Sequence, residues 1–228
     1  MKLKKGCFSL LIFFLLLTIN ISAQKSNVGN WFVYLGNQKI NNQWNWHNEL
    51  QYRNFNFLGD LNQLLLRTGI GYNLTENNNN ILLGYGFINS QKYISDSNEK
   101  VGTNEHRIYQ QFITKQSFDK VFLQHRYRIE ERFLPNDFQM RFRYFIGINI
   151  PINKPKIEKN AFYLSGYNEI FINAQQHIFD RNRLYGAIGY VINKNIKMEG
   201  GYMAQTVSTG NRNQFQIVVF NNIPFTIN

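Results

Sequence analysis

Arginine and glutamate residues recur at every second position in several segments of this chain. In the stretch EERFLPNDFQMRFRYF at 130–145, Arg141 and Arg143 alternate with Phe142 and Tyr144. Guanidinium and carboxylate groups at this spacing can pair across neighbouring strands, or they can attract an anion. We expect thirteen such residues to line one interior: Glu49, Arg53, Arg67, Glu105, Arg107, Arg126, Arg128, Glu130, Arg132, Arg141, Arg143, Glu169 and Arg183.

The pairing of these charges can be predicted in one place. If a turn is centred on Pro135 and Asn136, Glu130 lies opposite Arg141, and Arg128 lies opposite Arg143. The thirteen residues comprise nine arginines and four glutamates, so they cannot all neutralise one another. Water, other polar groups or a bound small anion must meet the surplus. Two interpretations remain open: a lumen filled by interlocked side chains, and a narrow pore that prefers anions.

Catalysis is the competing class of function. Many hydrolases use serine and histidine, and this chain offers four histidines, but no spacing singles out a pair with Ser90, Ser95, Ser165 or Ser208. The histidines are His47, His106, His125 and His177. The sequence therefore predicts no catalytic site, and a lipid-modifying hydrolase remains an alternative.

Metal, cofactor and nucleic-acid sites are not indicated either. Glu105 and His106 are adjacent, as are Glu130 and Glu131, and neighbours in a strand point to opposite faces. The arginines alternate with apolar residues instead of forming an exposed basic patch, which argues against nucleic acid as a partner. We expect no cofactor.

The elements that position these residues are strands. Apolar or aromatic residues alternate with polar ones through 44–53, and the same period of two returns in 61–74 and 81–93. Turn-forming residues separate such segments, and no segment between them reads as a crossover helix, so we expect an antiparallel meander. The expected strands are 28–36, 43–53, 61–74, 80–93, 104–117, 120–133, 138–150, 161–173, 182–193, 195–207 and 211–222.

Eleven segments conflict with a general rule. Bacterial single-chain barrels in the outer membrane have an even number of strands. We therefore expect 10 or 12 strands, with Trp31 to Gly36 outside the barrel wall or two strands fused near the C-terminus.

The first 23 residues have the layout of a secretory signal peptide. Three lysines precede an apolar run that ends at Ser22 and Ala23, and this run is short for a transmembrane helix. We expect cleavage near Ala23 and a barrel domain over 24–228.

Cleavage changes the charge of the chain. Removing these three lysines from 25 basic residues leaves 22 against 14 acidic ones, a formal charge of +8. The only cysteine, Cys7, lies in the removed segment, so disulfides cannot hold the fold.

The bulky apolar faces indicate which side of the sheet meets lipid. They recur in every expected strand, and aromatic residues such as Trp44, Trp46, Phe133 and Phe138 gather near strand ends. His125 also falls on this face. We expect an all-β, antiparallel up-and-down transmembrane β-barrel in the outer membrane of a diderm bacterium, in contact with lipid and lipopolysaccharide.

A soluble periplasmic β-barrel that binds a ligand is the alternative. Neither a specific substrate nor an oligomeric state follows from the sequence.

A set of local motifs resembles the bacterial family catalogued as domain of unknown function 2490, whose members are predicted to form outer-membrane barrels. The motifs span nearly the whole expected mature chain. The resemblance implies the barrel and its location, and it implies no activity. The residues that carry it include ELQYR at 49–53, LLLRTGIGYNL at 64–74, NEHRIYQQF at 104–112, HRYRIEERF at 125–133, RFRYFIGINIP at 141–151 and FDRNRLYGAIGY at 179–190.

Overall fold

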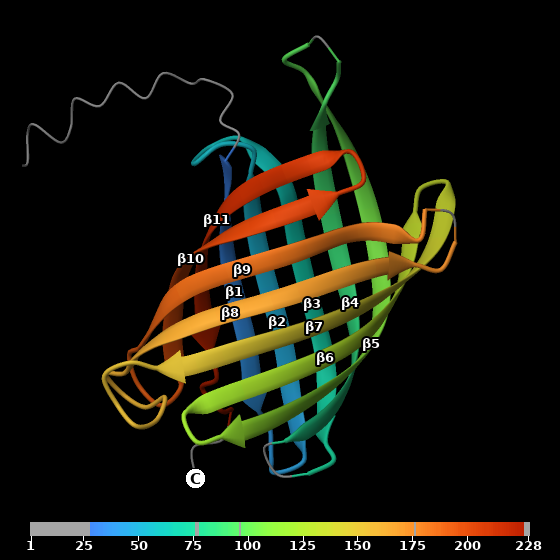
Figure 1. Cartoon of the computed structure of the whole chain (residues 1–228). Coiled ribbons are helices and arrows are strands. Elements are labelled where there is room, and N and C mark those ends of the chain that lie inside the picture. The colour runs from blue at the N-terminus through green and yellow to red at the C-terminus, as the bar shows by residue number, and fades with distance from the viewer. Residues whose placement is uncertain (1–27, 76–77, 96, 176, 226–228) are drawn as a thin grey trace, which may run out of the picture.

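Eleven β-strands form one closed barrel in the computed structural model (Figure 1), which describes residues 28–75, 78–95, 97–175 and 177–225. The expected signal peptide lies outside the described residues. In the described part of the chain, no helix is long and apolar enough to cross a membrane. The strands are β1 (Val28–Lys39), β2 (Trp44–Asn54), β3 (Leu61–Asn73), β4 (Asn79–Tyr93), β5 (Lys100–Phe118), β6 (Val121–Leu134), β7 (Asp137–Pro151), β8 (Phe162–Asn173), β9 (Phe179–Val191), β10 (Ile196–Val207) and β11 (Gly210–Asn221).

Each strand pairs antiparallel with the next one along the chain, which confirms the predicted meander. The predicted strand positions agree with the observed ones to within a few residues, but the predicted count of 10 or 12 is wrong. Segment 28–36 belongs to the barrel wall as part of β1, and β1 pairs with β11 in parallel over Val28–Gly36. An odd count is possible because this one parallel pair closes the sheet. It also places the start of β1 and the end of β11 at opposite ends of the barrel (Figure 1).

The short connections form where the sequence predicts turns. β5 and β6 are joined by Asp119 and Lys120, and Asp119 adopts a φ of 50°, a left-handed conformation that aspartate tolerates better than most residues. Pro135 and Asn136 join β6 to β7, as expected. This tight turn fixes the register of the two strands that carry the densest run of charges.

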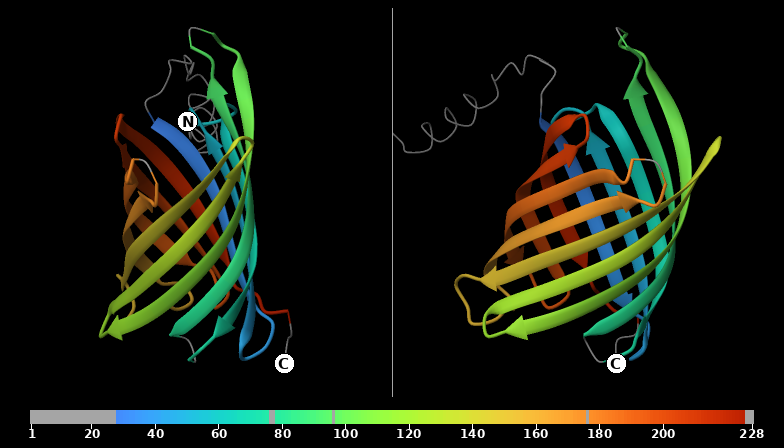
Figure 2. Two further views of the ribbon diagram at one scale, coloured as in Figure 1. Left: turned by 90° about the vertical axis from the view of Figure 1, so that its right-hand side faces the viewer. Right: turned by 45° about the vertical axis from the view of Figure 1, so that its right-hand side comes forward.

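The barrel is flattened, with strands of different slope on its two broad sides. Figure 1 shows β1–β4 running steeply along one side, while β6–β9 cross the other side at a shallow slope. The views in Figure 2 show that β5 curves between these two sides. The flattening brings side chains from opposite walls close together across the interior.

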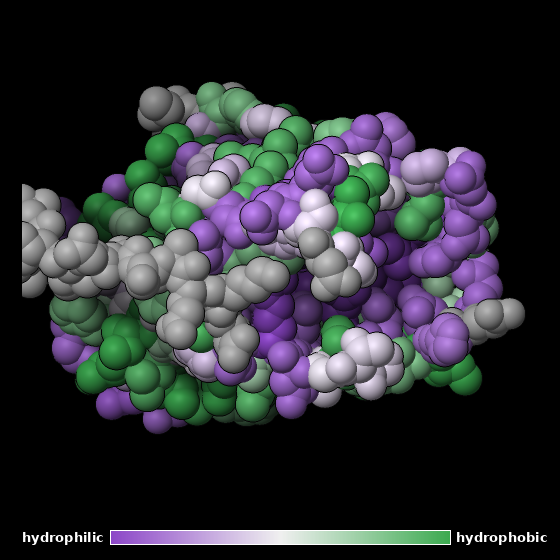
Figure 3. All heavy atoms as spheres, turned by 90° about the horizontal axis from the view of Figure 1, so that it is seen from above, coloured by the Kyte–Doolittle hydropathy of each residue, from purple (hydrophilic) through white to green (hydrophobic). Residues whose placement is uncertain are grey.

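The two faces of the sheet differ as the alternation predicts. In β7, Arg141 and Arg143 are buried, whereas Phe142 is 42% exposed on the outside. Seen from above, hydrophilic side chains gather in the recessed central part of the barrel end, and many hydrophobic ones lie along the flank (Figure 3).

The interior is not charged throughout. A cluster of buried apolar side chains lies against β1, β9, β10 and β11, and it contains Trp31, Val33, Tyr185, Met203 and Val218. Most of the buried charged residues come from β2, β3 and β5–β8, and the others are Arg183 on β9 and Glu199 on β10. Buried charge is therefore densest over β2, β3 and β5–β8, and the apolar cluster lies over β1 and β9–β11.

Candidate functional site in the barrel interior

Glu130 lies at the centre of the charged interior, with none of its surface exposed. Arg141 is directly opposite it on β7, and its Nη2 donates to Glu130 Oε2 at 2.6 Å. Arg143 Nη1 donates to the other carboxylate oxygen at 2.5 Å. Both carboxylate oxygens are thus engaged by charged donors, the arrangement that a buried carboxylate needs. The observed register also sets Arg128 opposite Arg143.

Three further arginines reach Glu130, two of them from other strands. Arg67 on β3 approaches it to 3.5 Å, Arg107 on β5 to 3.8 Å and Arg128 on β6 to 3.5 Å. β4 and β5 lie between β3 and β6 in the sheet, so the contact from Arg67 crosses the interior instead of following the wall. Five guanidinium groups therefore converge on one carboxylate from four strands.

The other glutamates extend this network along the barrel. Glu169 on β8 pairs with Arg126 at 2.7 Å and with Arg143 at 2.6 Å. Because Arg143 contacts both Glu130 and Glu169, these ion pairs form one continuous group. Glu105 pairs with Arg107 and Arg132, each at 2.6 Å, and Glu49 pairs with Arg67 at 3.0 Å.

Arg53 has a different environment from the other buried arginines. It is 7% exposed, and its guanidinium group donates hydrogen bonds to the amide oxygens of Gln51 and Gln63. In the described part of the chain, no carboxylate forms an ion pair with it. Arg128 likewise donates to the amide oxygen of Gln111, at 2.9 Å from Nε. Neutral amides solvate these cations without neutralising them.

Aromatic rings separate the guanidinium groups inside the barrel. Phe171 on β8 is 1% exposed, and the Arg143 and Arg183 guanidinium carbons lie 4.4 and 4.6 Å from its ring centre. Trp31 on β1 stacks with Arg53 at 3.8 Å and with Arg183 at 4.9 Å. Cation–π contacts of this kind stabilise a cation that has few carboxylate partners.

These inward aromatic residues were missed by the sequence prediction, which placed bulky apolar residues on the outer face. A signal was present, because Phe171 follows Glu169 by two positions and Tyr109 follows Arg107 by two. The period of two puts both rings on the charged face. Tyr109 is fully buried, with Arg128 at 4.5 Å from its ring.

The thirteen predicted residues come together in the interior. Eleven of them are buried, and the other two, Arg126 and Arg132, keep 21% and 13% of their side-chain surface exposed. Asp180 on β9 was not predicted, although it pairs with Arg141 at 2.7 Å. Glu199 on β10 was missed as well, and it accepts a hydrogen bond from Tyr163 at 2.9 Å.

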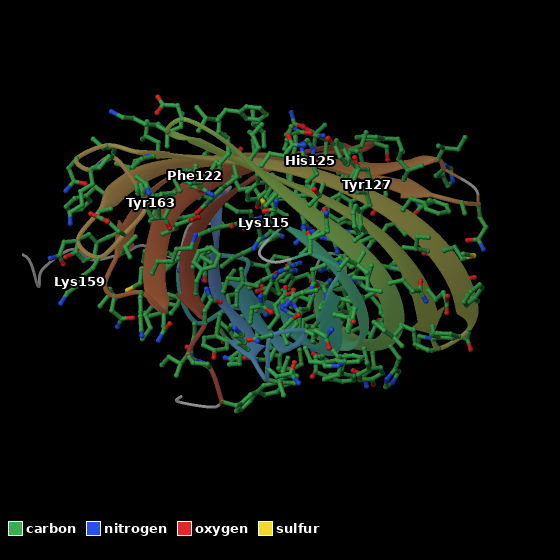
Figure 4. The ribbon with its side chains drawn as sticks, turned by 90° about the horizontal axis from the view of Figure 1, so that it is seen from below. Lys115, Phe122, His125, Tyr127, Lys159 and Tyr163 are labelled. Carbon is green, nitrogen blue, oxygen red and sulfur yellow. The ribbon has the colours of Figure 1, made fainter. Side chains whose placement is uncertain are left out.

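A cavity of about 210 Å³ lies beside the network. It extends to Lys197, the second residue of β10, and to Phe220, the last residue but one of β11. The cavity therefore reaches the lower strand ends, shown from below in Figure 4. Six cationic residues and three carboxylates line it: Arg53, Arg67, Arg126, Arg143, Arg183 and Lys197, with Glu49, Glu169 and Glu199.

Two of the histidines form hydrogen bonds with tyrosines. His106 shares a hydrogen bond with Tyr85 at 2.6 Å, and His125 shares one with Tyr144 at 2.9 Å, where it also stacks on the ring. Within the described ranges, no hydrogen bond joins a histidine to a serine. The same residues contain no group of three or more His, Cys, Asp or Glu side chains that could hold a metal ion.

The fold and the interior define a closed, mainly antiparallel β-barrel whose inside is held by arginine–glutamate pairs. Residues 28–216 match the model of the family described as Protein of unknown function (DUF2490), so the chain belongs to this family, as the resemblance predicted. No match was found among the curated proteins or among the solved structures.

Proposed function

We propose that the protein is an outer-membrane β-barrel whose lumen is closed by its ion-pair network, so that it serves as a membrane-embedded scaffold and not as an open porin. The observation that carries this proposal is Glu130, which has no exposed surface and joins arginines from both sides of the interior. An open aqueous channel would leave the central charges hydrated. The network instead supports a filled lumen, the arrangement of small barrels.

The outer face supports the membrane location. Large apolar side chains remain 40–61% exposed there, as Ile108, Leu66 and Leu184 illustrate. An apolar surface of this extent would be a liability in water and is suited to hydrocarbon. Antiparallel pairing and the β1–β11 seam satisfy the backbone groups around the barrel, which lipid demands.

Aromatic pairs at the two ends of the barrel give further support. Phe55 with Tyr93 and Phe133 with Phe138 lie near the upper end, at ring-centre separations of 5.1 and 5.2 Å. Near the lower end, Trp44 pairs with Tyr72 at 5.0 Å, and Phe162 pairs with Tyr190 at 4.8 Å. Two belts of rings are the usual feature of barrels that span a bilayer.

Lipid is therefore the partner that we propose for the outer face. Lipopolysaccharide is a further partner at the end of the barrel that carries the loop between β7 and β8. This loop contains Lys154, Lys156 and Lys159, which suit phosphate groups.

Single-channel recording tests the closed lumen. The purified protein in a planar bilayer is expected to give no steady conductance, whereas a variant that removes charges from the network, such as Glu130→Ala with Arg141→Ala, is expected to conduct. Steady, anion-selective conductance of the unaltered protein would favour the narrow-pore alternative. Fractionation of the producing bacterium tests the location separately. A membrane barrel is expected in the membrane pellet, with a gel mobility that changes on boiling. A soluble periplasmic protein would instead remain in the supernatant and migrate identically before and after boiling.

A further inference from the structure

The cavity beside the ion-pair network is lined by two chemically different kinds of side chain. One kind is charged and comprises Arg126, Arg143 and the other charged residues named above. The other kind is apolar or aromatic and belongs to or packs against the buried apolar cluster: Trp31, Val33, Leu35, Tyr185, Val218 and Phe220. A molecule that contacts both kinds favourably has an anionic part and an apolar part.

The charge of the lining is unbalanced. Six cations and three carboxylates line the cavity. Arg67 and Arg143 also reach Glu130, which lies outside the lining, and Glu169 is already shared by Arg126, Arg143 and Arg183 at 2.7, 2.6 and 4.0 Å. Lys197 is only loosely paired, with its Nζ 4.0 Å from Glu199. A surplus of buried positive charge is costly unless an anion or water joins it.

Buried polar atoms without partners point to the same cavity. Tyr185 is 4% exposed and lines the cavity, and its hydroxyl has no hydrogen-bond partner. Arg126 Nε and Asn149 Oδ1, from two other lining residues, are also buried and unpaired. Buried polar groups are normally satisfied, so these atoms are available to bind water or a ligand in the cavity.

The volume limits the size of the ligand. An apolar cavity of about 150 Å³ holds a benzene molecule. A cavity of about 210 Å³ therefore has room for a ring, or an equivalent short chain, together with one small polar group. Inorganic phosphate suits it less well, because a strongly hydrated ion would lose water against the apolar lining residues without gaining contacts there.

We propose that this cavity is a binding site for a small organic carboxylate, with the carboxylate among the cationic lining residues, Arg126 and Lys197 included, and the hydrocarbon part against Val33, Leu35 and Val218. The site goes beyond the proposed membrane role, and it does not depend on where the barrel resides. The lower end, where Lys197 lies, is the nearest route of entry.

Calorimetric titration of the protein in a neutral maltoside detergent tests the proposal. Phenylacetate is expected to bind at one site per chain. Phenylacetamide keeps the ring and removes the charge, and acetate keeps the charge and removes the ring, so each is expected to bind at least tenfold more weakly. Equal binding of phenylacetate and phenylacetamide, tighter binding of inorganic phosphate, or no binding of phenylacetate would each overturn the proposal.

Two variants locate the site. Lys197→Met keeps an apolar side chain beside Tyr163 and Phe220 while removing the ammonium group, and it is expected to weaken phenylacetate binding about tenfold. Lys159→Met is the matched control, because Lys159 lies in the exposed loop between β7 and β8 and is labelled at the periphery in Figure 4. Equal affinities of the two variants for phenylacetate would overturn the placement.

Arg126→Gln provides a second test of the site and is also expected to weaken phenylacetate binding about tenfold. Gel mobility before and after boiling reports whether each variant is folded.

Discussion

Gly84 on β4 and Tyr109 on β5 are directly opposite each other, and the ring of Tyr109 occupies the space into which a side chain at position 84 would project. The missing side chain of glycine thus lets a fully buried ring lie flat against the inner wall. Gly189 and Tyr163 repeat the arrangement across β9 and β8. Pairs of glycine and an aromatic residue are a known device for stabilising barrels.

Gly84→Ala is expected to lower the free energy of unfolding by about 1–3 kcal/mol, because the new methyl group overlaps the Tyr109 ring. Denaturant titration of the folded barrel measures the change. Gly186→Ala is the control, since a methyl group there meets nothing within 4 Å, and a change within about 0.5 kcal/mol is expected. Equal effects of the two substitutions would show that the Tyr109 contact is unimportant.

Glu130→Gln is expected to destabilise the barrel by about 3–5 kcal/mol, because it leaves several buried arginines without their shared counter-ion. Glu131→Gln removes the same charge one position along the strand, on the outer face, where Gln110 is its hydrogen-bond partner. A change within about 0.5 kcal/mol is expected for this control. The temperature at which heated samples lose their folded gel mobility provides a rapid measurement of both.

Leu66→Arg distinguishes a membrane barrel from a soluble one. Leu66 is 43% exposed on the outer face near the middle of β3. In lipid vesicles, arginine at mid-height is expected to cost about 2–4 kcal/mol of folding free energy. Leu58→Arg, in the loop between β2 and β3, serves as control because Leu58 is 69% exposed beyond the strand ends. If both substitutions were neutral, the outer face would not be in hydrocarbon.

Disulfide cross-linking tests the parallel seam between β1 and β11. The register sets Phe32 opposite Ile217 and Tyr34 opposite Val219, so the double cysteine variants at each pair are expected to oxidise readily. Phe32 with Asn221 is the mismatched control, because these positions are four residues out of register. Non-reducing gels give the readout, and cross-linking of the control as fast as the matched pairs would contradict the fixed register.

Much of the fold was predictable from the sequence. The period of two and the turn residues gave all the strand positions, and the turn at Pro135 and Asn136 gave the pairing of Glu130 with Arg141. These features are local, since each depends on residues close together in the chain. The number of strands in the wall was not predictable in this way, because it depends on how the first strand meets the last.

The interior was predicted only in part. In β2 and β7 the charged face and the apolar face differ clearly, so their inward residues could be recognised. In β8 both faces carry large apolar side chains, with Tyr167 and Phe171 inside and Leu164 and Ile172 outside. Alternation cannot separate two apolar faces, which explains why the inward rings of β8 were missed.

The seam between β1 and β11 also constrains how the molecule folds. Every other strand pair joins sequence neighbours, whereas at the seam the side chain of Gln38 donates to the backbone carbonyl of Asn221, 183 positions further along. Bringing such distant segments together has a large entropic cost, which the neighbouring hairpins do not share. We therefore expect the ring of strands to close last, and a nascent chain that lacks β11 has two unpaired edges open to aggregation.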